Sequence, residues 1–176
     1  MSGAKARKLF GTDGIRGVAG EFPLDAKTIY AAGLALGHSL RGKPGAKVLI
    51  GRDTRESSPW IAATIAAALR ETGVRVESAG VIPTPAVAFL TRTHGFDAGV
   101  VISASHNPWQ DNGIKLFGAD GYKLPDATEL AMEEEIARHS SQADLPNEPE
   151  LPTLQDNAAL RNDYIQFLMD CVPGCG

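Results

Sequence analysis

A short apolar run that ends in a polar turn constrains the fold of this chain more than any other feature. Residues 98–102, Ala-Gly-Val-Val-Ile, have the length and β-branched content of a strand covered on both faces. Asn107-Pro108 follows, and proline both restricts the residue before it to extended backbone and cannot donate to a β-ladder. Ser105 is therefore expected just beyond the C-terminal end of a buried strand. In an open α/β sheet, ligands bind at that end.

Apolar runs of strand length alternate with helix-like segments over residues 1–140, and this alternation predicts an α/β domain. Ser57-Ser58-Pro59 predicts a helix start, with a serine as N-cap and proline at the first helical position. The expected strands are 47–50, 74–81, 98–102, 114–117 and 122–124, and the expected helices are 24–40, 60–72, 84–93 and 125–139.

Two turn signals lie between the central strand and the last of these helices. Asn112-Gly113 is the dipeptide most typical of a tight β-hairpin. A second turn, at 118–121, would let residues 114–117 pair with residues 122–124. We therefore expect a hairpin after the serine turn, with Lys115 projecting back over it.

The C-terminal part of the chain is organised differently. Glu133 to Glu135, in the last helix of the domain, is predicted to be a solvated face, and residues 141–156 are polar, proline-rich and typical of a linker. A lone helix follows, within residues 157–176. It either packs back on the first domain or leads into a second one. Its apolar side carries Leu160, Tyr164, Ile165 and Leu168.

Composition excludes several classes of partner and compartment. The 176 residues carry a formal net charge of −4 without a basic face, so we expect no nucleic-acid partner. No apolar run approaches the roughly 20 residues that span a bilayer, so no membrane is expected. Met1 to Lys8 lacks the apolar core of a secretion signal, which favours the cytoplasm. Cys171 and Cys175 fit reduced thiols in that compartment, with a metal role left open.

The residues alone leave the chemistry of Ser105 open. A serine hydroxyl is a poor nucleophile without a base or a metal, and the side chain of the adjacent His106 is expected to diverge from it. A serine hydrolase is therefore disfavoured, and no Gly-x-Ser-x-Gly elbow is present. Ser105, His106 and Asn107 would equally serve as polar caps of a turn.

Basic side chains lie in motifs that fit either phosphate binding or plain structure. Arg16 stands between glycines, and a guanidinium binds phosphate through two parallel hydrogen bonds. Lys115 is either a surface lysine or an acid/base group in a shielded site. Arg52 and Arg55 follow a strand, and either one would hold the serine turn by pairing with Asp53 or Asp13.

Three motifs together resemble the α-D-phosphohexomutase family. They are Phe10 to Gly17, Gly51 to Arg55, and Ser103 to Pro108 with Asp111 to Lys115. Their order and spacing extend the resemblance over nearly the whole chain, and the first two motifs are similar to those of the phosphoglucosamine mutase branch. Proteins of this family have four domains and more than twice this length. The resemblance therefore implies the first domain of a longer protein, a three-layer α-β-α sandwich with a mixed, mostly parallel sheet.

The resemblance also implies an activity and roles for individual residues. Ser105 would carry a phosphoryl group, with Arg16 and His106 binding phosphate or sugar. Asn107 would hold the loop in shape, and Lys115 would act as acid and base. The implied reaction interconverts glucosamine 6-phosphate and glucosamine 1-phosphate through a 1,6-bisphosphate.

The resemblance implies a cofactor and partners as well. One Mg²⁺ would bind the phosphate on Ser105, with its other ligands in a second domain. The expected partners are a phosphosugar and the remaining domains of the polypeptide, and an exposed docking face would favour self-association. The chain alone is expected to show no turnover. The alternatives are a phosphoglucomutase or phosphomannomutase of the same family, or a non-catalytic α/β module.

Overall fold

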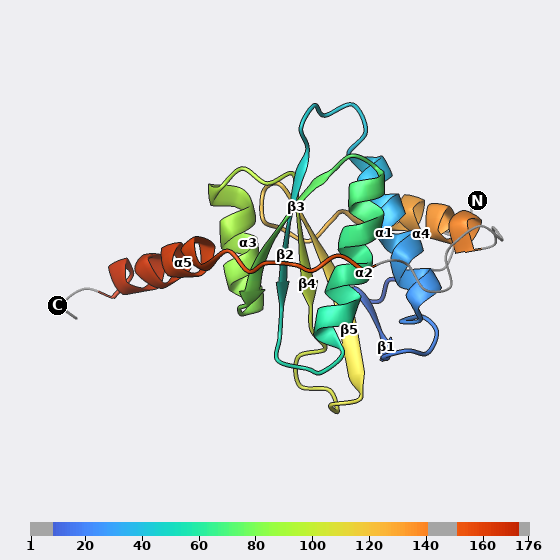
Figure 1. Ribbon diagram of the computed structural model, residues 1–176, viewed down its shortest axis with the longest axis horizontal. Coiled ribbons are helices and arrows are strands. Elements are labelled where there is room, and N and C mark those ends of the chain that lie inside the picture. Colours follow the sequence, from blue (N-terminus) through green and yellow to red (C-terminus); the bar gives the residue numbers. More distant parts are fainter. Residues whose placement is uncertain (1–8, 141–150, 173–176) are drawn as a thin grey trace, which may run out of the picture.

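The computed structural model describes residues 9–140 and 151–172, which form a three-layer α/β/α sandwich (Figure 1) around one five-stranded sheet. The sheet order is β1-β5-β4-β2-β3. The strands are β1 (Ile15–Val18), β2 (Lys47–Arg52), β3 (Arg75–Val81), β4 (Ala98–Ile102) and β5 (Asp111–Gly118). The helices are α1 (Ala26–Ser39), α2 (Ser58–Glu71), α3 (Thr84–Thr93), α4 (Asp126–Ser140) and α5 (Ala158–Asp170).

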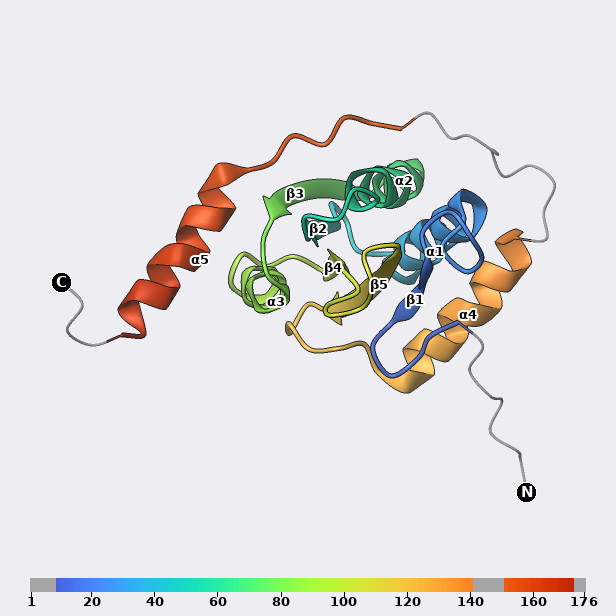
Figure 2. The same cartoon turned by 90° about the horizontal axis from the view of Figure 1, so that it is seen from below.

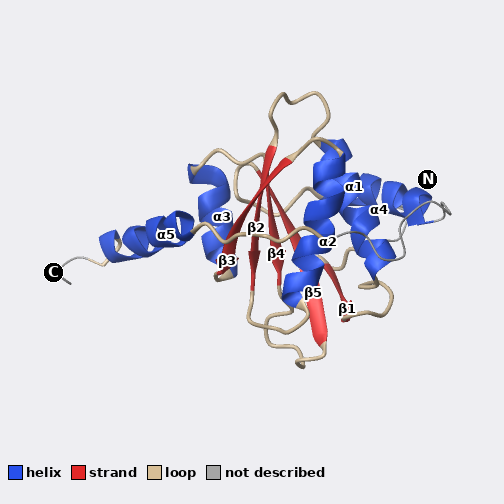
Figure 3. Cartoon of the chain, viewed as in Figure 1, coloured by secondary structure: helices blue, strands red, loops and turns tan. Residues whose placement is uncertain are grey.

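The predicted fold class is confirmed. Strands β3, β2 and β4 are parallel, β5 is antiparallel to β4, and β1 is antiparallel to β5, so β5 alone of these strands runs against the others. The helices α1 and α2 pack on one face of the sheet and α3 packs on the other (Figure 2). The sheet is therefore mixed and mostly parallel, with a helical layer on each side (Figure 3).

The central strand β4 occupies the residues that the sequence predicts. All of its residues are buried, because β2 and β5 flank it and helices cover both faces. Val100 and Ile102 belong to the core shared with α1 and α2, whereas Val101 belongs to the core shared with α3. This alternation is that of a strand buried on both sides.

The starts of α1 and α2 both differ from the prediction, and α1 begins at Ala26 rather than at residue 24. Asp25 caps α1, since its carboxylate accepts hydrogen bonds from the backbone amide of Thr28 at 3.0 Å and from its hydroxyl at 2.7 Å. The predicted N-cap of α2, the serine directly before Pro59, lies one residue too late: the N-cap is Ser57, and its side chain makes no capping hydrogen bond. Its hydroxyl accepts instead from the Nδ2 of Asn112 at 2.8 Å, a contact between elements far apart in sequence.

The predicted hairpin turn at Asn112-Gly113 is wrong, because both residues lie within β5. Asn112 is fully buried, and its amide bonds the hydroxyls of Ser57 and Ser58. At Gly113, a Cβ would lie 2.7 Å from the carbonyl oxygen of Ser103. The dipeptide therefore provides close packing under the serine loop. The second predicted turn is confirmed, because the amide of Gly118 bonds the carbonyl of Tyr122 at 2.8 Å, although the pairing beyond it is one bridge.

The acidic run of α4 is also not the solvated face that the sequence predicts. Glu133 is 7% exposed, and its Oε1 accepts from the backbone amides of Leu9 at 2.8 Å and Phe10 at 2.7 Å. Glu135 faces α1 rather than solvent, while Glu134 is exposed as expected. The run differs from the prediction because α4 packs against α1 and the segment before β1.

The C-terminal helix packs back on the domain through one end. Leu160 and Tyr164 are buried against α3, and Phe167 stacks on Phe89 with ring centroids 4.1 Å apart. The predicted apolar side is only partly used, since Ile165 and Leu168 are 46% and 44% exposed. Residues 141–150 of the predicted linker and Cys175 lie outside the described residues, and Cys171 is exposed. Among the described helices, none combines the length and apolar character needed to cross a membrane.

Candidate functional site

The serine loop, residues 103–108, lies where the sequence predicts, at the C-terminal end of β4. Ser105 is exposed and has a φ of 57°, a left-handed conformation that costs an L-residue about 1–2 kcal/mol. Its amide donates to the Ser103 hydroxyl at 3.0 Å, and the amide of Asn107 donates to the carbonyl of Ala104 at 3.1 Å. Strained residues of this kind gather at functional sites, where the surrounding structure holds them in place.

Arg55 provides much of that surrounding structure. Its Nη2 donates to the carbonyls of Ser105 at 2.9 Å and Asn107 at 3.0 Å, and its Nη1 to those of Pro108 at 2.6 Å and Asp111 at 3.0 Å. Its Nε donates to Asp53 at 3.0 Å, so each of the five guanidinium hydrogens has a partner. The pairing of Arg55 with Asp53 is thus confirmed, but sequence reasoning missed the four carbonyl contacts. Arg52 pairs instead with Asp156, at 3.0 Å.

Asp53 connects the loop after β2 to the serine loop. Its Oδ1 accepts from the Ser58 hydroxyl at 2.7 Å and from the amide of Arg55 at 3.0 Å. Partial burial raises the pKa of Asp53, but hydrogen bonds from Ser58, the Arg55 amide, Ser103 and the Arg55 guanidinium outweigh burial and hold this pKa below its ordinary value. The carboxylate is thus ionised at neutral pH, and Ser103 links it to the amide of Ser105.

The lowered pKa of Asp53 predicts a loss of stability in acid. Because the folded-state pKa lies below the unfolded value of about 3.9, the ionised carboxylate stabilises the fold above that value. The stabilisation is lost as the pH falls from about 4 through the folded-state pKa. We expect the unfolding free energy, measured with urea between about pH 6 and about pH 3, to fall less steeply with decreasing pH in Asp53→Asn than in the wild type. Glu21→Gln, at an exposed position, is the matched control and should follow the wild-type pH dependence. A pH dependence of Asp53→Asn that runs parallel to that of the wild type would contradict the prediction.

Two further predicted site residues meet beside the loop, around Asp13. Arg16 donates through Nη1 to the Oδ1 of Asn107 at 3.1 Å and through Nη2 to Asp13 at 2.9 Å. The Nζ of Lys115 lies 3.8 Å from the same Asp13 oxygen. The buried Nε of Arg16 has no hydrogen-bond partner within the described part of the chain. Arg16 therefore contacts the serine loop at Asn107, and Arg16 and Lys115 share Asp13.

The antiparallel pairing of β1 with β5 creates this arrangement. Arg16 stands opposite Gly113, and Ile15 stands opposite Ile114, the neighbour of Lys115. Gly14 has a φ of 88°, and a Cβ there would lie 2.1 Å from the carbonyl oxygen of Ile114. Glycine thus lets the loop before β1 touch β5, which carries Asp13 to the two cations.

His106 does not form a catalytic pair with Ser105. Its Nδ1 lies 3.5 Å from the Ser105 hydroxyl oxygen, and both side chains are exposed. In the described structure, no carboxylate is hydrogen-bonded to His106, so the imidazole lacks the orienting group of a catalytic triad. This geometry disfavours the serine hydrolase interpretation.

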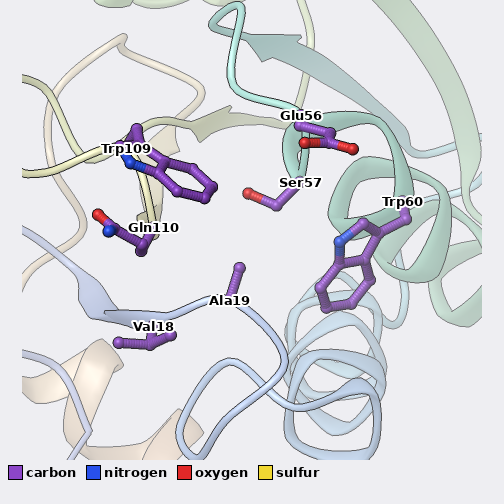
Figure 4. A pocket seen from close by; sticks show the side chains of 7 residues that line it. All are labelled: Val18, Ala19, Glu56, Ser57, Trp60, Trp109 and Gln110. Atoms are coloured by element: carbon purple, nitrogen blue, oxygen red, sulfur yellow. The ribbon is translucent and has the colours of Figure 1, made fainter.

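Two hollows border the site. A cavity of about 390 Å³ is lined by Gly11, Asp13, Arg16 and their neighbours, next to the two cations. A second, of about 440 Å³, follows the serine loop and is framed by Trp109 and Trp60 (Figure 4). Trp109 is 74% exposed. Sequence reasoning did not single out these tryptophans, although tryptophan is enriched at interfaces.

A strained serine in a loop at the C-terminal end of the central strand, with an arginine that contacts this loop and a lysine beside the same aspartate, is consistent with the phosphohexomutase class. Residues 7–143 match the family model described as "Phosphoglucomutase/phosphomannomutase, alpha/beta/alpha domain I". The chain belongs to the phosphoglucomutase/phosphomannomutase family and contains its domain I.

Named relatives agree with this assignment. A phosphoglucosamine mutase of Koribacter versatilis (strain Ellin345) is 56% identical over 171 residues, which are 96% of this chain and 37% of the relative. One from Solibacter usitatus (strain Ellin6076) is 52% identical over 93% of this chain and 36% of its own. The solved putative phosphomannomutase from Thermus thermophilus has a TM-score of 0.75 at 30% identity, over 96% of this chain and 37% of that one. The chain thus spans little more than a third of these relatives.

Proposed function

We propose that this chain is the serine-bearing N-terminal domain of a phosphoglucosamine mutase. The activity is the interconversion of glucosamine 6-phosphate and glucosamine 1-phosphate in the cytoplasm, with Ser105 as phosphoryl carrier. The observation that carries the proposal is the strained, exposed Ser105 in a loop bonded to Arg16 through Asn107, with Lys115 beside the same Asp13. The names of the relatives favour glucosamine phosphate over the glucose and mannose phosphates of the family.

The charges around the loop suit a phosphoserine. A phosphoserine carries about −1.5 to −2 charge near neutral pH and three strong acceptor oxygens. Arg16 has an unpartnered Nε and a Nη2 bond to an Asp13 side chain that is 62% exposed, a contact that a phosphate can replace. His106 lies close enough to the Ser105 oxygen to donate to a phosphate attached there. Asn107, held by Arg16 and Asp111, keeps the loop in shape.

The proposed transfer uses these residues in two steps. The Oγ–P bond of phosphorylated Ser105 breaks, and the phosphorus bonds to the free hydroxyl oxygen of the sugar monophosphate. Lys115 accepts the proton of that hydroxyl, the Ser105 oxygen keeps the electron pair of the broken bond and takes a proton from solvent, and the product is a 1,6-bisphosphate. In the second step the Ser105 hydroxyl gives its proton back to solvent as its oxygen bonds the phosphorus of the other phosphate, and Lys115 returns its proton to the sugar oxygen that the phosphorus leaves.

The described residues do not complete a site for Mg²⁺ at Ser105. Asp13 pairs with Arg16 and Lys115, and Asp53 with Arg55, so neither carboxylate is free for a metal. The chain's own contribution would be an oxygen of the Ser105 phosphate, and bound Mg²⁺ would neutralise phosphoryl charge. The remaining ligands are proposed to lie in another domain.

The need for metal ligands from another domain agrees with the proposed division of the chain. Residues 1–140 form domain I, residues 141–156 the linker, and residues 157–176 the lead into a second domain. The exposed apolar side chains of α5, Ile165, Leu168 and Met169, form a surface for that domain. In the isolated chain the same surface would favour self-association.

Phosphosite mapping by mass spectrometry tests the proposal, on the protein purified from its native host. We expect a chain longer than 176 residues with phosphate on Ser105. We also expect the 176-residue chain alone to show no mutase turnover. Unmodified Ser105 in a protein that is active on glucosamine phosphate would refute the carrier role, and an inactive unmodified protein would favour a non-catalytic module.

A further inference from the structure

A second group of titratable side chains lies away from the serine loop, where α1 packs against α4. His38 is in the last turn of α1, and Glu135 and His139 are one turn apart on α4. The His38 Nδ1 lies 2.5 Å from the Glu135 Oε1, and the His139 Nε2 lies 3.4 Å from the same oxygen. One ligand atom from each residue fits within a 4.8 Å cluster. The sequence indicates no chemistry for the two histidines and predicts Glu135 as part of a solvated face.

The cluster is neither fully buried nor fully open. The side chains of His38, Glu135 and His139 are 16%, 23% and 18% exposed. The two imidazoles lie 5.3 Å apart, centroid to centroid, on neighbouring helices (Figure 2). Each of the three side chains is therefore shielded but keeps part of its surface accessible to solvent.

The ligand types and spacing match a transition-metal site. Two histidines and one carboxylate with an open fourth position form a known zinc ligand set, with Zn–N distances of about 2.0–2.1 Å. In a tetrahedron of that size, ligand atoms are about 3.3–3.4 Å apart. The distance from His139 to Glu135 already has this value, and the distance from His38 to Glu135 reaches it when the two atoms separate by less than about 1 Å.

The backbone adds to the attraction for a cation. His38 and His139 both lie in the last turn of their helices, where unpaired carbonyl groups carry partial negative charge. The neighbouring Arg138 is exposed, and its Nε is directed to the carbonyl of Glu134. The cluster therefore combines an anionic ligand with two helix C-termini.

We propose that His38, Glu135 and His139 bind a divalent transition-metal ion of the Zn²⁺ type, which clamps α1 to α4. This site is separate from the phosphoryl-transfer site and does not depend on the proposed function. Helix α1 has 14 residues, about 21 Å at 1.5 Å per residue, and it follows the end of β1 next to the tryptophan cavity. His38 therefore lies at the far end of α1 from that cavity.

The metal clamp would act on the phosphoryl-transfer site through α4. Glu133, two residues before Glu135, holds the amides of Leu9 and Phe10. That segment leads directly into the loop of Asp13 and Arg16. A metal ion fixing α4 against α1 would thus steady the anchor of the phosphate-binding arginine, so its role is structural.

Titration calorimetry with Zn²⁺ on the 176-residue chain tests the proposal. We expect one Zn²⁺ to bind per chain. His38→Ala and His139→Ala should each lower the Zn²⁺ affinity by more than the roughly 10- to 100-fold loss that follows removal of a residue that only hydrogen-bonds a metal ligand. His94→Ala is the matched control, because His94 is also at a helix end but pairs with Asp163. The absence of one-to-one binding, or affinity within about tenfold of wild type in both cluster variants, would overturn the site.

A measurement without variants covers the case in which a substitution prevents folding. Zn²⁺ added to the wild-type chain should shift the imidazole NMR signals of His38 and His139 and leave that of His94 unchanged. A shift of His94 with the other two unmoved would also overturn the site. Neither experiment reads mutase activity, so their outcome is independent of the role of Ser105.

Discussion

Replacing Ser105 with alanine in the full-length protein is expected to lower mutase turnover by roughly 10⁴-fold or more, the scale seen when a nucleophile is removed. The Ser105 oxygen is the atom to which the proposed mechanism attaches the phosphoryl group. Arg16 and Lys115 would remain, so the binding of a sugar phosphate should change much less than turnover. A coupled assay for glucosamine 1-phosphate, with kcat and KM fitted separately, measures both.

A glycine at the same position is the matched control. Ser105 has a φ of 57°, which glycine adopts freely and alanine only with strain. Ser105→Ala keeps the strain that the wild-type serine already carries, whereas Ser105→Gly relieves it, so the glycine variant should be about 1 kcal/mol more stable than the alanine variant, and both should be inactive. Mutase turnover of Ser105→Gly within about tenfold of the wild type would mean that the Ser105 hydroxyl is not the phosphoryl carrier and that the loop conformation alone matters.

The parts of the fold that follow from local pattern could be predicted from the sequence. Residues 98–102 form the central strand with the predicted bounds, because a short β-branched run stopped by Asn-Pro has few alternatives. The predicted helix 24–40 is likewise present, as α1, although it begins two residues later than predicted. Motif resemblance singled out Arg16, which bonds Asn107 of the serine loop, and Lys115, which approaches the same Asp13 as Arg16, an arrangement that no local pattern specifies.

Features set by contacts between distant segments could not be predicted in this way. Asn112-Gly113 has the composition of a turn, yet it lies in β5 because the Asn112 amide bonds the hydroxyls of Ser57 and Ser58. Glu133 has the sequence context of a solvated residue, yet it binds amides more than 120 residues away. His38 and Glu135 are 97 residues apart. In each case a tertiary partner, absent from the local window, decides the outcome.

The second large effect is expected at Arg55. Replacing it with alanine removes one donor from the carboxylate of Asp53, from three carbonyls of the serine loop and from the carbonyl of Asp111 at the start of β5. Since a hydrogen bond to a charged group contributes about 1.5–3 kcal/mol, and the Arg55 side chain is 11% exposed, we expect a loss of about 2–4 kcal/mol of unfolding free energy. Urea unfolding of the 176-residue chain measures this loss.

Lysine should not rescue the position. An ammonium group has three donors around one nitrogen, whereas the five guanidinium hydrogens of Arg55 reach Asp53 and two pairs of carbonyls in one plane. Arg55→Lys is therefore expected to keep part of the stability and still lose loop order. Hydrogen exchange at residues 103–111 should become faster in both variants.

Arg52 is the matched control, because it stands in the same motif but pairs with the half-exposed Asp156, away from the serine loop. Arg52→Ala should cost about 1 kcal/mol or less and leave exchange in the loop unchanged. Equal effects of the two alanine variants would mean that Arg55 is an ordinary surface ion pair. A loss confined to Arg55 would instead identify it as the residue that holds Ser105 in its left-handed conformation, and so as the positioning group of the phosphoryl carrier.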